Sequence, residues 1–251
     1  MSSSPATSAP DLSAEKMLAA RIAVGWVREG MVLGLGTGST AAPFIRLLGQ
    51  RVRDEGLRIQ ATATSRASDE LAREVGIPLL EPRRGLRFDL TVDGADELDA
   101  QLRLIKGGGG ALLREKVIAT ASDYLLIVAD STKAVRQLGR FPLPLEVVPF
   151  ALPWVMDAVD ALGGVPELRM DKQHPLEPAH SDQGNLLVDC HFGVIADPDW
   201  LAEQLIVIPG MVEHGLFLGL ASSAIVVEGG QAQVWRPGQN PAPAARFTAL
   251  P

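Results

Sequence analysis

Four acidic residues follow a short strand pattern in the segment 88–99, and their side chains are candidates for proton transfer. Apolar and polar residues alternate over 88–92, which is the period of a strand with one buried face. The next seven positions contain Asp93, Asp96, Glu97 and Asp99. Nearby carboxylates bind sugar hydroxyls and transfer protons, and two unpaired ones would raise the pKa of one member. An acidic turn before a helix has the same composition, and the segment alone favours neither interpretation.

Gly94 lies inside this acidic segment. A glycine there permits an unusual backbone turn, through which Asp93 and Asp96 would point to a common centre.

A second segment, residues 106–116, combines a cation, four consecutive glycines and a further carboxylate. Four glycines lose much conformational entropy on ordering, so the pattern favours close approach to a ligand over a merely structural turn. Lys106 can place a positive charge on an oxyanion, and Glu115 lies about one turn into the helix that follows. By itself, Glu115 would more often be a surface acid paired with Arg114 or Lys116.

A third segment, residues 34–40, has the sequence GLGTGST between an apolar strand and a helix. Glycines, the unpaired N–H groups of a helix start, and the hydroxyls of Ser39 and Thr40 suit a phosphate, although such turns also occur for tight packing. Ser39 replaces the third glycine of the dinucleotide fingerprint, and the strand after it ends without the acid that binds a ribose. These departures argue against a nicotinamide-dependent dehydrogenase.

A fourth segment contributes hydroxyl groups from Thr64, Ser65 and Ser68, which follow the second strand pattern. We expect them in the same crevice, although an ordinary helix cap explains Ser65 equally well.

The elements that must position these segments alternate between short apolar strands and helices, beginning with a helix capped by Ser13. This alternation predicts an α/β fold with a Rossmann-like open sheet. Each of the four segments begins where an apolar strand ends. Ligands of such sheets bind beyond the carboxyl ends of the strands, so the four segments should meet in space.

The second half of the chain has a different pattern. Its order is β-α-β-β-α-β if the segment after residue 210 supplies the last strand, which predicts an inserted ferredoxin-like α+β domain. A strand pair with a Gly-Gly turn then rejoins the first sheet. We therefore predict a disordered extension at 1–10, a catalytic domain at 11–138 and 211–251, and a small domain at 139–210.

The composition of the chain excludes several classes of function. The 251 residues are 47% apolar, which supports a proper core, and 23 basic against 30 acidic residues leave a charge of -7, which argues against nucleic-acid binding. Four scattered histidines predict no metal site. The single cysteine, Cys190, is expected to be a buried strand residue. The N-terminal sequence does not resemble a secretory signal and no apolar run reaches membrane-span length, so we expect no membrane association and a cytoplasmic protein.

Several motifs in order resemble ribose-5-phosphate isomerase of type A, over about residues 13–235: GLGTGSTA, TVDGADELD, LIKGGGGALLREKVIA, ADSTK, FPLPLEVVP and DQGNLLVDC. The resemblance implies an aldose–ketose isomerase that interconverts D-ribose 5-phosphate and D-ribulose 5-phosphate in the non-oxidative branch of the pentose phosphate pathway. It implies no metal and no cofactor, and a homodimer or homotetramer.

The resemblance also implies roles for single residues. The phosphate would be held by Thr37, Gly38, Ser39 and Thr40, assisted by Lys16. Asp93 and Asp96 would bind hydroxyls and help to open the sugar ring, Lys106 would stabilise the enediolate oxygen, and Glu115 would be the base. Further substrate contacts would come from Gly94, Ala95, Gly107, Gly108, Gly109 and Lys133.

Two segments depart from the family pattern: the first ten residues and the loop 171–182. They leave assembly and loop structure open. A non-catalytic sugar-phosphate sensor is the alternative function. It would need the phosphate loop but not Glu115, and it would normally carry a DNA-reading helix pair, which is not apparent here.

Overall fold

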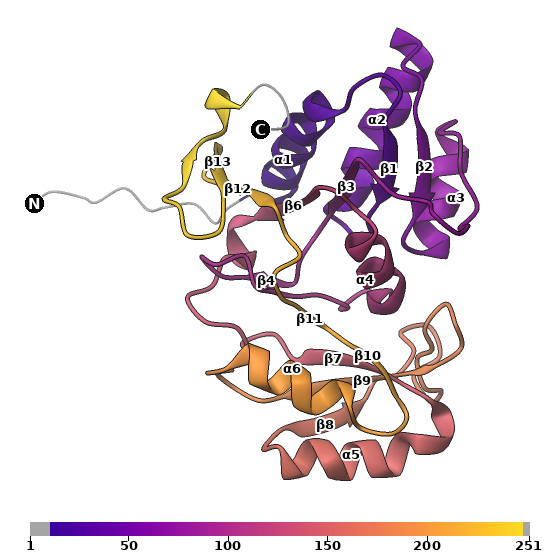
Figure 1. The fold of residues 1–251 in the computed structure, drawn as a ribbon, viewed down its shortest axis with the longest axis vertical. Helices are drawn as coiled ribbons and strands as arrows, with labels where there is room; N and C mark the ends of the chain where they lie inside the picture. Colours follow the sequence, from indigo (N-terminus) through magenta and orange to yellow (C-terminus); the bar gives the residue numbers. More distant parts are fainter. Residues whose placement is uncertain (1–10, 248–251) are drawn as a thin grey trace, which may run out of the picture.

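The computed structural model describes residues 11–247 and contains two main sheets (Figure 1). The larger has seven strands in the order β14-β13-β12-β6-β3-β1-β2. Five neighbours are parallel: β12 (Ser223–Glu228), β6 (Leu125–Asp130), β3 (Leu90–Asp93), β1 (Val32–Leu35) and β2 (Gln60–Ala63). β13 (Gln231–Trp235) and the edge strand β14 (Ala242–Pro243) extend this sheet with antiparallel pairing, and Gly229 and Gly230 form the predicted turn between β12 and β13.

The helices of this part are α1 (Leu12–Trp26), α2 (Ala41–Glu55), α3 (Arg66–Glu74) and α4 (Leu112–Thr120). Every residue of β3 and β6 is buried, as expected for parallel strands that are covered on both faces. The predicted cap of the first helix is wrong by two residues. The Asp11 carboxylate, and not Ser13, accepts the N–H groups of Ser13 and Ala14, because the helix begins at Leu12.

The smaller sheet has four antiparallel strands in the order β10-β7-β9-β8. Its elements are β7 (Leu143–Val147), α5 (Leu152–Ala161), β8 (Val165–Leu168), β9 (Leu186–His191), α6 (Pro198–Ile206) and β10 (Met211–His214). The predicted Rossmann-like open sheet with an inserted ferredoxin-like sheet is therefore confirmed. Strand β10 pairs with β7, so this sheet runs four residues past residue 210. The division into two domains stays a prediction.

A third sheet, which the sequence did not predict as a separate unit, joins the two others. It contains β4 (Glu97–Leu98), β5 (Leu104–Ile105) and β11 (Leu216–Phe217). Short 3-10 turns are η1 (Ser131–Lys133), η2 (Pro149–Ala151) and η3 (Ala244–Arg246). Helix α4 contacts both β7 and β10, so it lies between the large sheet and the small one (Figure 1).

Each main sheet has its own apolar core. Trp26 and Phe44 are among the largest fully buried side chains beside the large sheet, and Val155 and Val188 are buried in the small one. Cys190 is buried in β9, as predicted, and burial raises the pKa of its thiol. Within residues 11–247, no helix combines the length and the apolar character needed to cross a bilayer. The predicted extension, residues 1–10, lies outside the described residues.

Candidate active site

A cavity of about 80 Å³ lies where the loops after β1 and β3 meet the four-glycine turn, residues 107–110. Its lining is Thr37, Gly38, Ser39, Thr40, Gly94, Ala95, Asp96, Lys106, Gly107, Gly109, Glu115 and Lys133. All of these were predicted as site residues. Larger cavities of about 720 and 610 Å³ lie elsewhere, and neither contains Glu115 or Lys106.

Lys106 is the centre of a buried group of charges at the floor of this cavity. Its Nζ lies 3.0 Å from Asp93 Oδ2 and 3.4 Å from Glu115 Oε1, and it donates to the Gly94 carbonyl at 2.5 Å. The exposed fractions of Lys106, Asp93 and Glu115 are 3%, 1% and 5%. Such charges keep close partners because desolvation of a lone ion is costly.

Burial and mutual attraction shift the pKa values of Glu115 and Lys106. Burial raises the pKa of Glu115 to about 8, although Lys106 opposes that rise. Glu115 Oε2 is buried and has no hydrogen-bond partner among the described residues. Burial alone would lower the pKa of Lys106, but Asp93 and Glu115 outweigh it and raise that pKa. Lys106 therefore lies beside a carboxyl group whose pKa is raised to about 8, and a pKa near the working pH suits a general acid–base catalyst.

The neighbours of Glu115 on α4 do not pair with it, contrary to the surface-acid interpretation. Lys116 Nζ lies 2.6 Å from Glu213 Oε1, and Arg114 Nη1 lies 3.6 Å from Asp182 Oδ2. Successive helical residues point about 100° apart, so Glu115 alone of the three faces Lys106.

Asp93 and Asp96 have different surroundings and do not form the unpaired couple considered from the sequence. Asp93 Oδ1 accepts the N–H groups of Thr37 at 3.0 Å and Gly94 at 2.7 Å, while its other oxygen pairs with Lys106. Asp96 accepts the Gly108 N–H at 2.8 Å and lines the cavity. Asp93 thus binds Lys106 and two backbone N–H groups, whereas burial raises the pKa of Glu115.

Gly94 does not have the unusual backbone predicted for it. Positive φ angles occur instead at Gly107, with 102°, and at Gly110, with 80°. Gly94 contributes through its own peptide groups, because its N–H binds Asp93 and its carbonyl binds Lys106.

The other two acids of the opening cluster support the backbone. Glu97 is fully buried and accepts the N–H groups of Gly139 and Phe141, each at 2.7 Å. Asp99 accepts from the Arg103 guanidinium at 2.7 Å and from backbone groups. The cluster therefore serves both purposes: two carboxylates belong to the site and two hold the chain around it.

The loop between β1 and α2 has the features of an anion site. Gly38 has φ 97°, and Thr40 at the N-cap of α2 makes no side-chain hydrogen bond to the helix. N–H groups at such a helix start are therefore available to an anion. Lys16 Nζ donates to Ser39 Oγ at 2.9 Å and lies 3.7 Å from Asp130 Oδ2, which brings a cation to the same loop.

The hydroxyls of the fourth segment support this loop but do not line the cavity. Thr37 Oγ1 lies 2.7 Å from Thr64 Oγ1 and 2.8 Å from Ser65 Oγ, and Ser68 Oγ donates to the Gly36 carbonyl at 2.7 Å. The Ser65 hydroxyl also accepts the N–H of Ser68 and so caps α3.

Two buried acids that position the site were not predicted as site residues from the sequence. Glu15 Oε2 accepts the N–H of Ser131 at 2.9 Å and its hydroxyl at 2.8 Å, and this fixes the turn that carries Lys133. Asp130 lies beside Lys16 at the end of β6. Glu15 acts over a long sequence separation, which local patterns do not show, whereas Asp130 also accepts the N–H of Thr132, two residues on, at 3.0 Å.

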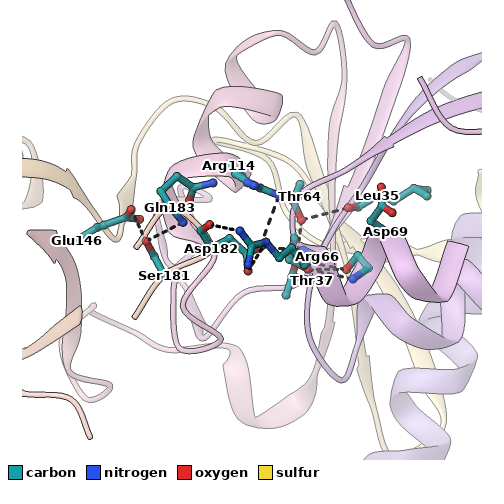
Figure 2. A network of polar contacts seen from close by, with 12 residues as sticks. Leu35, Thr37, Thr64, Arg66, Asp69, Arg114, Glu146, Ser181, Asp182 and Gln183 are labelled. Carbon is teal, nitrogen blue, oxygen red and sulfur yellow. Dashed lines mark hydrogen bonds and ion pairs between the residues drawn. The ribbon is translucent and has the colours of Figure 1, made fainter. Parts of the chain in front are cut away.

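A polar bridge joins the large sheet to the loop that ends at residue 182 (Figure 2). Asp182 accepts the N–H of Arg66 at 2.8 Å and lies near the guanidinium of Arg114 (Figure 2). Ser181 donates to the buried carboxylate of Glu146 at 2.6 Å. The end of the loop 171–182 is therefore anchored on both sides.

Over residues 11–247, no three His, Cys, Asp or Glu side chains gather in a way that could hold a metal ion.

Comparisons with known proteins show which family the sequence and the fold resemble. The sequence model of the family Ribose 5-phosphate isomerase A (phosphoriboisomerase A) matches residues 60–231. The ribose-5-phosphate isomerase A of Roseiflexus castenholzii is 50% identical over 210 residues, which cover 83% of this chain and 89% of the relative.

Two solved structures are similar over almost their whole length. The ribose 5-phosphate isomerase A of Methanocaldococcus jannaschii has a TM-score of 0.84 and 37% identity, covering 88% of this chain and 98% of that one. A D-ribose-5-phosphate isomerase in complex with phospho-erythronic acid has a TM-score of 0.87 and 34% identity, covering 90% and 100%.

Proposed function

The chain belongs to the ribose 5-phosphate isomerase A family; it is an aldose–ketose isomerase of D-ribose 5-phosphate, and we propose that Glu115 is its base. The product is D-ribulose 5-phosphate, and the reaction belongs to the pentose phosphate pathway. The observation that carries the assignment of the base is the buried contact between Glu115 and Lys106 at the cavity.

The phosphate end of the substrate binds to the loop of residues 37–40, with Lys16 beside it. This loop supports the assignment through its free helix-start donors and its hydroxyls. The phosphate does not react. Its binding energy can therefore be used to orient the reacting carbons at the other end of the substrate.

The reacting end lies between Glu115, Lys106 and Asp96. Asp96 binds hydroxyls and assists ring opening. Glu115 then removes the proton from C2 of the open aldose, and the electron pair forms the C1–C2 double bond while O1 becomes an oxyanion. Lys106 stabilises that enediolate oxygen. A proton moves from O2 to O1, and Glu115 returns its proton to C1, which completes the ketose.

Asp93 acts through Lys106 and through the backbone. Its pairing with Nζ keeps Lys106 charged and aimed at the cavity, and its bonds to Thr37 and Gly94 join the phosphate loop to the catalytic group. Gly94, Ala95, Gly107, Gly108, Gly109 and Lys133 complete the substrate contacts.

An isomerase assay tests this function. The purified protein is given D-ribose 5-phosphate with and without EDTA, and ketose formation is measured. We expect turnover at the same rate in both cases, because no step uses a metal. Ribose 5-phosphate binding without ketose formation would identify a sensor instead, and a rate abolished by EDTA would contradict metal independence.

Assembly and location extend the proposal. We expect a cytoplasmic homodimer or homotetramer. Phe150 and Trp154 support an interface, because they are 82% and 60% exposed and their ring centres lie 5.5 Å apart. Light scattering of the wild type and of Trp154→Glu measures the mass: a smaller assembly in the variant supports this interface, and a monomeric wild type contradicts it.

A further inference from the structure

Arg169, which follows β8 of the small sheet, reaches across to the glycine turn of the active site. Its Nη1 donates to the carbonyls of Gly107 at 3.1 Å and Gly108 at 3.3 Å. Its Nε and Nη2 donate to the two oxygens of Asp189 on β9, at 2.8 Å and 2.5 Å. One guanidinium therefore binds a carboxylate and two backbone carbonyls at once.

The glycine turn has one internal hydrogen bond, from the Gly110 N–H to the Gly107 carbonyl at 2.9 Å, and its glycines have no side chains to restrain it further. Glycines have few conformational restraints of their own, and Gly107 and Gly110 adopt the left-handed region, with φ 102° and 80°. Side chains that hold this turn must therefore come from other residues packed against it. The planar fork of arginine suits this task, since it stays charged and its bidentate pairing with Asp189 fixes its direction.

The two held carbonyls determine where the N–H groups of the same peptides point. In a trans peptide, the carbonyl and the N–H lie on opposite sides of the plane. The Gly108 N–H accordingly points away from Arg169 and reaches Asp96 Oδ2 at 2.8 Å. The Gly109 N–H has no hydrogen-bond partner in the described part of the chain, and Gly109 lines the cavity.

We propose that Arg169, held by Asp189, is a positioning residue for the isomerase reaction: it fixes the glycine turn so that Asp96 and the Gly109 N–H face the substrate. The inserted small sheet thus takes part in catalysis without touching substrate. This inference rests on the proposed function.

The test compares Arg169→Met and Arg169→Lys with a matched control, Arg51→Met. Arg51 also binds one carboxylate, that of Glu55 at 2.8 Å, and two carbonyls, those of Val24 at 2.8 Å and Val27 at 3.2 Å, but none of these residues lines the cavity. The measurements are kcat, the inhibition constant of inorganic phosphate and the midpoint of thermal unfolding.

Both Arg169 variants should lose at least roughly tenfold in kcat, because small misplacements of substrate-positioning groups are costly. Lysine keeps the charge but cannot reach the carboxylate and both carbonyls together. The phosphate inhibition constant should stay at the wild-type value, because the loop of residues 37–40 is unchanged. Arg51→Met should keep the wild-type kcat.

A folded Arg169 variant with the kcat of Arg51→Met would overturn the inference. A parallel loss of phosphate affinity would also overturn it, since that indicates general disorder. If Arg169→Met does not fold, Arg169→Lys decides. An inactive wild type would refute the proposed function itself, whereas an active wild type beside unimpaired Arg169 variants would refute this inference alone.

Discussion

The ammonium of Lys106 lies 3.4 Å from the carboxylate of Glu115, and both side chains are almost completely buried. This contact places a candidate base and a candidate oxyanion donor within reach of the same substrate atoms. It also gives Glu115 two opposing influences: burial favours its neutral form, and Lys106 favours its charged form.

The pH dependence of kcat/KM should report Glu115. The base must be deprotonated, and burial raises its pKa to about 8, so kcat/KM should increase with pH and reach half its maximum near that value. Steady-state kinetics over a series of pH values measures this. A kcat/KM profile that reaches half its maximum near the ordinary pKa of 4.5 would contradict the buried base.

Stability should change with pH in the opposite direction. A folded-state pKa above the unfolded value means that the native state holds the proton more tightly, so this contribution is complete below 4.5 and is lost as pH rises toward about 8. Denaturant unfolding of Glu115→Gln, which cannot ionise there, should therefore show a smaller loss of stability than the wild type over this range. Equal losses would show that Glu115 does not titrate in this way.

Gly36→Ala should impair activity because the new methyl group has no room. Its Cβ would lie 2.2 Å from Asp93 Oδ1 and 2.5 Å from Asp93 Cα, so the partner of Lys106 must move. We expect kcat to fall at least about tenfold. Gly25→Ala in α1 is the control, because nothing lies within 4 Å of its Cβ. Equal kcat values for the two variants would show that Asp93 does not need its present position.

Lys16→Met should weaken substrate binding more than it slows the chemistry. Lys16 lies at the phosphate loop, bound to Ser39, and a contact with the remote phosphate is the same in the ground state and the transition state. KM should rise roughly tenfold with kcat nearly unchanged, as expected for loss of uniform binding. Arg21→Met, an exposed cation on the same helix, is the control. A fall in kcat alone would place Lys16 at the reacting carbons instead.

Local patterns in the sequence predicted most of the fold. The apolar pattern of residues 88–92 identified β3, although its alternation is typical of one buried face and the strand is in fact buried on both faces. The β-α-β-β-α-β order identified the ferredoxin-like sheet. Helix ends were less certain: Asp11 and Ser13 are both good caps, and only the start at Leu12 decides between them.

Local spacing identified Lys106 as a candidate oxyanion donor, but it favoured a surface acid at Glu115, and only the family resemblance implied that Glu115 is the base. The separate roles of Asp93 and Glu97 were not predicted, since both follow the same strand and only distant partners distinguish them. Arg169 gave no signal, because its contacts with the glycine turn join residues 61 and 62 positions apart.

The most direct test of the account is the kcat of Glu115→Gln, which keeps the shape of the side chain and removes the base. We predict a loss of at least roughly 100-fold, the lower end of general-base contributions, with an unchanged inhibition constant for inorganic phosphate. Glu74→Gln, at an exposed position on α3, should behave as the wild type. A folded Glu115→Gln variant that isomerises ribose 5-phosphate at a near-normal rate would contradict the account.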